Sequence, residues 1–314
     1  MKFPIFPPQA SSIARQVDAL CLSLIAVCGV VLLGLLLVIL YFLVKYRSSK
    51  TVYRSRFRGA STPFELTWTF IPLFLFMGMF AWGAVIYRDQ QISPPAEIEL
   101  NIVGKQWMWK VQHPNGRREI NEMHVPVGQT VKLIMASQDV IHSFYLPAFR
   151  IKQDVVPGRL TTQWFKATKP GVYHIFCAEY CGTDHSRMRG RVFVMDPADY
   201  ERWLQSGARE PTLAQAGAQL FRFLGCSGCH IGSAVVRAPP LEGIFGKPIP
   251  LQAGGIVVAD EAYIRDSILT PGRDVAAGYE PVMPSYQGQL TEEQVFELIA
   301  YIKGLSVETG GDLR

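Results

Sequence analysis

Charged residues are scarce in this chain and are missing from two long stretches near its start. Asp, Glu, Lys and Arg make up 18% of the 314 residues, against 49% hydrophobic residues. No charge occurs in the 26 residues from Ala19 to Val44, or in the 22 residues from Leu66 to Tyr87. A helix of the first length would reach about 39 Å, more than the ~30 Å hydrocarbon core of a bilayer. This absence of charge excludes a wholly soluble protein and predicts two transmembrane helices.

Acidic residues are absent from residues 45–58, between the two apolar runs. The basic residues of this segment are Lys45, Arg47, Lys50, Arg54, Arg56 and Arg58. Short basic loops stay on the cytoplasmic side of a membrane. The N-terminus and everything after Tyr87 are therefore predicted on the outer, periplasmic face of a bacterial inner membrane. The first run is too long for a cleaved signal peptide. Because both flanks of the loop lie in lipid, nucleic acid is not its expected partner.

Cysteine is also sparse, with six residues in the chain, and no internal repeat or low-complexity segment occurs. Cys21 and Cys28 fall inside the first apolar run and are interpreted as packing residues. The other four form two close pairs, Cys177 with Cys181 and Cys226 with Cys229. Paired cysteines outside the cytoplasm usually form disulfides. Any other role has to follow from the residues around each pair.

The hydrophobic pattern changes twice after the membrane segments. From residue 98 apolar and polar residues alternate, and turn signals such as "HPNG" and "VVPG" separate further strand candidates. This pattern predicts a β-sandwich or barrel. Helical spacing follows Asp196, and Thr291 with Gln294 predicts a capped start for the last helix. We predict a membrane segment at 1–91, a β domain at 92–200, a linker at 201–213 and a helical domain at 214–314.

The stretch "CSGCH" places Cys226, Cys229 and His230 in the order needed for covalent attachment of haem c. The two thiols bond the haem vinyl groups, and the adjacent histidine reaches the iron. A disulfide gives no reason for the histidine, and a thioredoxin-like motif would lie in a βαβ unit. Zinc would need two further ligands nearby. The motif therefore predicts one covalent haem c.

Methionine and histidine are nearly absent after this motif. Met283 is the one methionine that follows Asp196, and no histidine follows His230. A thioether ligand raises the potential of a haem iron, so Met283 is the predicted second iron ligand. Residues 213–306 resemble a class I cytochrome c, where the proline of a "GPxLxG" turn offers its carbonyl to the haem histidine. The matching "APPLEG" implies this role for Pro239, with Ala238 in place of the usual glycine.

Residues 177–188, "CAEYCGTDHSRM", hold a second dense group of soft ligands. A disulfide between Cys177 and Cys181 would leave His185 and Met188 without a role, and zinc makes no use of a thioether. One thiolate, two imidazoles and a weak methionine suit a blue-copper site on a β-sandwich. Here one thiolate is left over, and two bridging thiolates could hold two copper ions. His142, next to a strand-like run, is the predicted second histidine.

At these residues the chain resembles a known family. The stretches "VIHSFYLPAFRIKQDVVPGR", "CAEYCGTDHSRM" and "GKQWMWK" resemble subunit II of haem-copper cytochrome c oxidases, over about residues 7–200. The resemblances imply a membrane α-hairpin, an all-β cupredoxin-like sandwich and an all-α class I cytochrome c domain. They also imply a dinuclear copper centre, CuA. Its implied ligands are the side chains of His142, Cys177, Cys181, His185 and Met188, and the main-chain carbonyl of Glu179.

Three further residues acquire a role only through this resemblance. The Glu179 side chain would bind a magnesium ion shared with subunit I. Trp107 would be the place where electrons enter, although alone it is typical of a strand aromatic that covers a core. Glu65 would lie at the mouth of a proton path into subunit I, although an acid at a membrane boundary can simply face headgroup water.

The resemblance and the haem motif together predict the electron-input subunit of an oxidase that reduces O2 to water and translocates protons. Electrons would come from an external donor, such as a cytochrome c or an upstream respiratory complex, and pass by haem c and CuA to subunit I. Subunit III is a further expected partner. One alternative is the electron-input subunit of a copper-dependent nitric oxide reductase. Another is a membrane-tethered copper and haem protein for metal delivery or sensing. A quinol oxidase subunit is excluded because that branch lacks the copper ligands.

Overall fold

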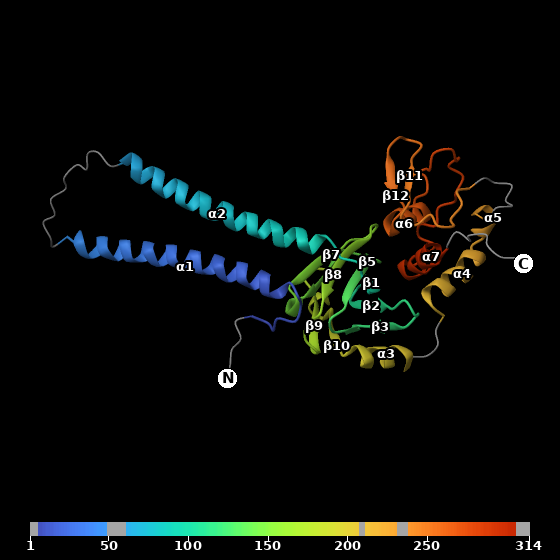
Figure 1. Cartoon of the computed structure of the whole chain (residues 1–314), viewed down its shortest axis with the longest axis horizontal. Coiled ribbons are helices and arrows are strands. Elements are labelled where there is room, and N and C mark those ends of the chain that lie inside the picture. Colours follow the sequence, from blue (N-terminus) through green and yellow to red (C-terminus); the bar gives the residue numbers. More distant parts are fainter. Residues whose placement is uncertain (1–5, 49–60, 207–210, 231–237, 306–314) are drawn as a thin grey trace, which may run out of the picture.

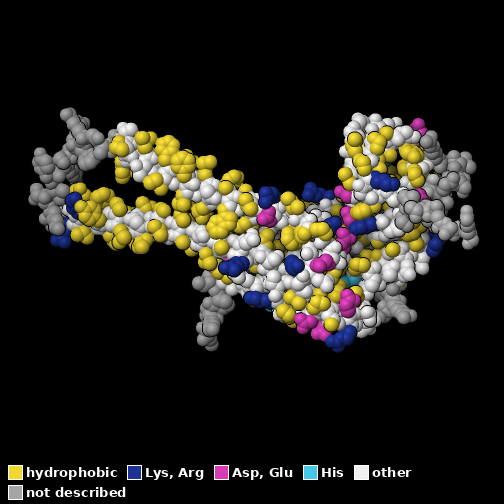
Figure 2. Space-filling model, in the orientation of Figure 1, with side chains coloured by type: hydrophobic (Ala, Val, Ile, Leu, Met, Phe, Trp, Pro, Cys, Tyr) yellow, Lys and Arg dark blue, Asp and Glu magenta, His cyan; other side chains and the backbone are white. Residues whose placement is uncertain are grey.

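Two long helices form the first part of the chain in this computed structural model, which describes residues 6–48, 61–206, 211–230 and 238–305. Helix α1 spans Ala14–Lys45 and α2 spans Ser61–Gln91, and both are long and apolar enough to cross a bilayer. They run side by side away from the rest of the molecule (Figure 1), and hydrophobic side chains cover their visible surface (Figure 2). The two predicted membrane helices are therefore confirmed. Of the connecting basic residues, Lys50, Arg54, Arg56 and Arg58 lie outside the described residues.

Ten strands form a sandwich of two five-stranded sheets. The first sheet has the order β3-β2-β1-β5-β8, with bounds Arg118–Ile120, Met108–Gln112, Ile98–Lys105, Thr130–Ser137 and Thr161–Lys166. The second has the order β4-β10-β9-β6-β7, with bounds Glu122–Pro126, Arg189–Met195, Gly171–Cys177, His142–Leu146 and Ile151–Val155. Short 3₁₀ turns occupy Pro147–Phe149 (η1) and His185–Arg187 (η2). The predicted sandwich is confirmed.

Alternation along the strands decides which side chains enter the core. In β1, Leu100 and Ile102 are fully buried between the sheets, where they join Trp109 and Phe144. The intervening residues of β1 point to the outer face of the first sheet, because successive side chains of a strand alternate between its faces. Val103 is one of these outward residues, yet it too is fully buried. Something outside the sandwich must therefore cover this face.

The cover is the C-terminal domain, the described part of which comprises residues 211–230 and 238–305. Its helices are α4 Leu213–Phe223, α5 Ser227–His230, α6 Glu261–Leu269 and α7 Glu292–Gly304. A small hairpin pairs β11 Pro248–Pro250 with β12 Ile256–Val258, and helix α3, Pro197–Ser206, leads out of the sandwich. Helix α7 lies beside β1 and β5 (Figure 1). Capping boxes start α4 at Thr212 and α7 at Thr291, as the sequence predicts for the last helix.

A buried ion pair connects the membrane hairpin to the sandwich. Arg150, just after η1, donates from Nε and Nη2 to the two carboxylate oxygens of Asp18 in α1, at 2.7 and 2.9 Å. The same guanidinium also donates to the carbonyl of Pro7 at 2.7 Å. Nearby, Ser11 Oγ donates to the carbonyl of Phe149 at 2.7 Å. The start of α1 is thus held against the turn that follows β6.

Candidate copper and haem sites

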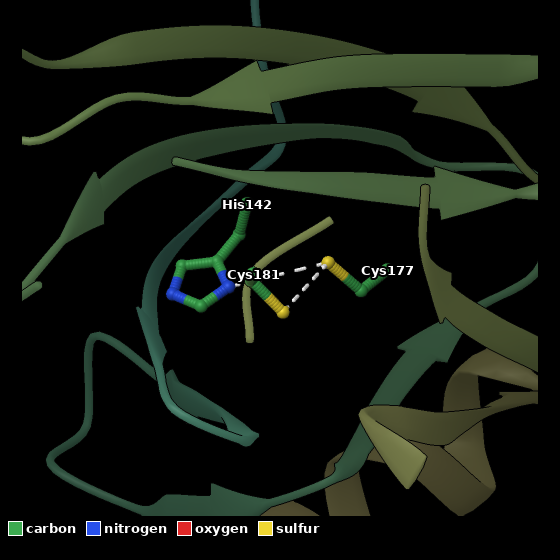
Figure 3. A group of neighbouring side chains, drawn as sticks. All are labelled: His142, Cys177 and Cys181. Carbon is green, nitrogen blue, oxygen red and sulfur yellow. Dashed lines mark hydrogen bonds between the residues drawn. The ribbon is translucent and has the colours of Figure 1, made fainter. Parts of the chain in front are cut away.

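Two cysteines and a histidine meet at one end of the sandwich. His142 begins β6, Cys177 ends β9, and Cys181 follows in the next loop. Figure 3 shows their side chains converging, and their ligand atoms all lie within 4.8 Å of one another. The two sulfur atoms are 3.7 Å apart, and His142 Nδ1 lies 4.0 Å from Cys177 Sγ. All three residues are buried.

The next turn brings the remaining predicted donors to the same place. His185 Nδ1 lies 3.4 Å from Cys181 Sγ, and Met188 Sδ lies 3.7 Å from the same sulfur. On the other side, the main-chain carbonyl oxygen of Glu179 lies 3.2 Å from Cys177 Sγ. The structure therefore brings all six predicted copper donors together, with four of them around the sulfur pair. The Glu179 side chain is exposed beside it.

The two thiols differ in their readiness to ionise. Burial opposes ionisation of Cys177, but hydrogen bonds with His142, with backbone groups and with Cys181 together outweigh it and lower the pKa of this thiol to about 6. Burial and the adjacent Cys177 sulfur raise the pKa of the Cys181 thiol to about 12. Like charges resist sharing one buried site. Holding both residues as thiolates therefore calls for cationic metal between them.

The donor set discriminates between the alternatives left open by the sequence. Cys177 and Cys181 are free thiols, so no disulfide joins them. A structural zinc site would be closed by four nitrogen or sulfur ligands and would leave the thioether of Met188 unused. Two thiolates, two imidazoles, a thioether and a carbonyl oxygen suit soft copper ions. The residues present fit a copper centre.

Two supporting residues were missed in the sequence. Asp139 Oδ1 lies 2.7 Å from Nε2 of His142, so the ring presents its other nitrogen to the sulfurs. Asp139 Oδ2 accepts from the backbone N–H of Gln106 at 2.7 Å. The Gln106 side chain donates to the Cys181 carbonyl at 2.8 Å, and Trp107 Nε1 donates to the same oxygen at 3.2 Å. In the sequence, the sign of this supporting role is that Asp139 lies three residues before His142.

The haem motif lies at the start of a short helix in the C-terminal domain. Cys226 precedes α5, and Cys229 and His230 lie within it. His230 Nδ1 is 2.9 Å from the carbonyl oxygen of Pro239, so its Nε2 is left for another partner. His230 and Met283 line the same apolar pocket. Burial raises the pKa of the Cys226 thiol. These residues fit a covalently held haem with axial histidine and methionine.

The two remaining predicted residues lie in different places. Trp107 is half-buried at the copper end of the sandwich. Glu65 lies near the start of α2, the end of that helix farthest from the sandwich in Figure 1, and its side chain is exposed. The structure therefore does not bring Glu65 near the copper residues.

Comparison with known proteins shows what this chain is similar to. Family models match at residues 2–82 (cytochrome c oxidase subunit II, transmembrane domain), 118–194 (its periplasmic domain) and 214–306 (cytochrome c). Cytochrome c oxidase subunit 2 of Alkalihalophilus pseudofirmus is 32% identical, over 79% of this chain and 74% of the relative. Its counterpart in Thermostichus vulcanus is 45% identical, over 37% and 35%. The crystal structure of the periplasmic domain of subunit II of cytochrome oxidase from Bradyrhizobium japonicum is 33% identical. That match covers 37% of this chain and 96% of the other, with a TM-score of 0.36.

Fold and donor sets together define a two-pass membrane protein for electron transfer, with a cupredoxin-like copper domain and a cytochrome c domain. The predicted fold class is thereby confirmed. The chain belongs to the cytochrome c oxidase subunit II family and is a subunit of a haem-copper terminal oxidase. Neither the nitric oxide reductase nor the metal-delivery alternative gains support from these relatives.

Proposed function

We propose that this chain relays electrons within the oxidase, from an external donor to its own haem c, then to a dinuclear CuA centre and on to subunit I. Subunit I would reduce O2 to water, coupled to proton translocation. The observation that carries this proposal is the convergence of four further copper donors around Cys177 and Cys181 in a chain that also holds a haem motif. The external donor would be a cytochrome c or an upstream respiratory complex.

The copper centre would contain two ions bridged by the two cysteine sulfurs. His142, His185, Met188 and the Glu179 carbonyl would complete its coordination, and each of these donors lies within 4.0 Å of one of the sulfurs. Such a centre supplies one-electron transfer when it is loaded. The protein's part is to hold the donors fixed, and Asp139 contributes by hydrogen bonding the second ring nitrogen of His142.

Trp107 is proposed as the place where electrons enter the copper domain. Its indole N–H donates to the carbonyl of Cys181, so a hydrogen bond joins a half-buried ring directly to a donor residue. In the C-terminal domain, Cys226 and Cys229 would carry the haem thioethers. His230 and Met283 would bind the iron, with Pro239 orienting the histidine.

Further parts of the proposal concern the membrane and the partner subunits. The exposed side chain of Glu179 would bind magnesium together with subunit I, and Glu65 would lie at the mouth of a proton path. The N-terminus and both redox domains would face the periplasm of a bacterial inner membrane, with subunit III as a further partner. Domain limits of 1–91, 92–200 and 214–314, with a linker at 201–213, complete the assignment.

Metal analysis and electron paramagnetic resonance of the purified oxidase test the proposal. We expect two coppers attributable to this chain, one c-type haem, and a seven-line hyperfine pattern, because one unpaired electron would couple equally to two copper nuclei. Replacement of Cys181 by serine should convert the pattern to the four lines of a single copper or abolish it. A four-line pattern in the unmodified protein would contradict the dinuclear centre.

A further inference from the structure

The outer face of the first sheet is covered by the chain's own C-terminal domain. Val103 of β1 and Ile134 and Ala136 of β5 point outward and belong to one apolar cluster with Phe296 and Ile299 of α7. Their burial depends on this domain, because alternation excludes them from the sandwich core.

Half-open pockets interrupt this contact. One, of about 230 Å³, lies between the domains and is lined among others by Asn101, Ile134 and Phe296. Another, of about 560 Å³, lies between Asp139 of the sandwich and Thr291 of the C-terminal domain. The core of a single domain is close-packed and lacks openings of this size. The contact therefore resembles a transient interface more than a continuous core.

Four ion pairs surround the apolar contact, and we refer to them as the docking seam. They are Lys110–Glu293 at 2.5 Å, Arg118–Glu297 at 2.7 Å, Lys303–Glu99 at 2.6 Å and Lys132–Glu261 at 3.6 Å. Three of them place the base on the sandwich and the acid on the C-terminal domain, so the two faces are complementary in charge. Acidic and basic side chains gather between the two domains in Figure 2.

The seam also fixes which side of the C-terminal domain faces the copper residues. Gln138, four residues before His142, donates to the Glu293 carboxylate at 2.7 Å. Glu293 lies in the first turn of α7, directly after the segment that carries Met283. Gln287 of that segment lines the same cleft as Asp139. The segment that follows Met283 is therefore held beside the copper end of the sandwich.

Among the described residues, the C-terminal domain also has a pocket at the haem motif. Helix α5, with the haem motif, lies on the far side of α4 and α7 from the sandwich (Figure 1). This second pocket opens between Cys229 and Val282, and His230 and Met283 line it too. The Phe223 side chain nearby is 86% exposed and that of Val282 is 60% exposed. This arrangement leaves a surface where an outside protein can approach the haem.

We propose that the outer face of β1, β2 and β5 is a reversible, charge-held docking surface for the chain's own haem domain. Docking holds the segment that follows Met283 beside the copper end of the sandwich. The use of this arrangement in electron transfer rests on the relay proposed above. Binding of the haem domain to this surface requires neither copper nor electron transfer. Salt screens charges at a protein surface, so the docked fraction falls as ionic strength rises.

Zero-length carbodiimide crosslinking of the purified oxidase, read by mass spectrometry, tests the dock. The reagent joins an amine and a carboxylate that touch, so Lys303 reports on both of its neighbours. The Lys303–Glu99 product requires docking. The Lys303–Glu261 product arises within the C-terminal domain, where the two groups are 3.0 Å apart, and serves as an internal reference. We expect the ratio of the two products to fall about tenfold between ~0.01 and ~1 M salt, as the screening length shrinks from ~30 to ~3 Å.

Charge reversal provides the decisive variants. The double variant Lys110→Glu, Arg118→Glu keeps the crosslinked residues unchanged. It should lower the ratio of the Lys303–Glu99 product to the Lys303–Glu261 product at low salt. Adding Glu293→Lys and Glu297→Lys should restore it, because the pairs are re-formed with opposite polarity. Arg191→Glu is the matched control, since Arg191 pairs with Glu122 inside the sandwich. The same double variant should slow haem-to-copper electron transfer.

Two outcomes would overturn the inference. An unchanged ratio in the Lys110→Glu, Arg118→Glu protein would mean that charge does not hold the dock. A Lys303–Glu99 product that joins two chains would mean that the surface receives the haem domain of a second copy. Copper and haem contents measured on the same samples keep a failure of the relay separate from a failure of the dock.

Discussion

Asp139 illustrates how one side chain can organise a metal centre without touching the metal. Its carboxylate joins the outer nitrogen of His142 to the backbone of Gln106, whose own side chain reaches the Cys181 carbonyl. Burial opposes ionisation of Asp139, but these hydrogen bonds hold its pKa below the ordinary value. A charged acceptor fixes the ring orientation more firmly than a neutral one would.

Asp139→Asn should therefore weaken copper binding while the sandwich stays folded. Residues that support a metal ligand in this way typically contribute 10- to 100-fold in metal affinity, so we expect copper loss to a chelator to become roughly tenfold easier. Copper retention and the copper spectrum provide the measurement. Asp154→Asn is the control, because Asp154 bonds Ser143 and Lys152 rather than a copper donor. Equal copper retention in the two variants would contradict this role.

A second buried cluster lies where α3 leaves the sandwich. The Glu119 carboxylate lies 2.8 Å from His113 Nε2 and 2.5 Å from His124 Nδ1. The His124 ring stacks on Trp203 of α3, with ring centres 4.2 Å apart. Burial opposes ionisation of Glu119, yet the two histidines outweigh it and lower its pKa to about 2 from an ordinary 4.5.

Glu119→Gln should destabilise the sandwich by about 1–3 kcal/mol near neutral pH, because a buried hydrogen-bonded charge is lost. A lowered pKa means that the stabilisation is complete above about 4.5 and is lost as the pH falls toward about 2. Urea unfolding from neutral to acid pH measures this difference between variant and parent. A difference in the free energy of unfolding between variant and parent that grows toward acid pH would contradict this role of Glu119.

At the scale of elements, the crossing of α4 and α7 holds the C-terminal domain together. A Cβ on Gly217 would lie 1.9 Å from the carbonyl oxygen of Glu297 and 2.8 Å from Cβ of Tyr301. Only a glycine lets the two helices approach this closely. Such close packing is a backbone contact, so neighbouring side chains cannot relieve it by changing rotamer.

Gly217→Ala should consequently destabilise the C-terminal domain by about 1–3 kcal/mol or more, the usual range for overpacking a filled interior. Thermal unfolding followed by the haem absorbance provides the measurement. Gly304→Ala is the matched control, because a Cβ there meets nothing within 4 Å. Similar unfolding temperatures for the two variants would show that α4 and α7 can move apart to fit the added methyl group without loss of stability.

Most elements could be predicted because their signals are local. The uncharged runs gave the membrane helices, alternation gave strands such as β1, and the Thr291 capping box gave the start of α7. Five of the six copper donors fall within twelve residues, so their meeting needs little knowledge of the fold. Gln106 and the docking seam escaped prediction. They depend on which strands become neighbours, and the parallel pairing of β1 with β5 joins segments about thirty residues apart.

At the scale of the whole molecule, the Asp18–Arg150 pair decides how the sandwich sits on its membrane hairpin. Both side chains are less than 10% exposed, and the guanidinium is further bonded to main-chain carbonyls of the N-terminal segment. Removing one partner of a buried pair leaves the other charge uncompensated, which typically costs about 3–5 kcal/mol. The pair is thus a structural joint between two parts of the chain.

Asp18→Asn should lower the unfolding temperature of the purified oxidase and leave the copper spectrum unchanged. Asp89→Asn, at the end of α2, is the control. Asp89 pairs with Arg88 at an exposed position, where ion pairs contribute little. If both variants unfold at the same temperature as the parent, the Asp18–Arg150 pair does not stabilise the assembled enzyme.

This joint has a consequence for the direction in which the copper end points. Transmembrane helices tilt to match the thickness of the lipid around them. Because the Asp18–Arg150 pair fixes the sandwich to α1, the sandwich must tilt with that helix. Thinner or thicker bilayers would then swing the copper residues sideways above the membrane plane, and the lipid itself would set how squarely they face the neighbouring subunit.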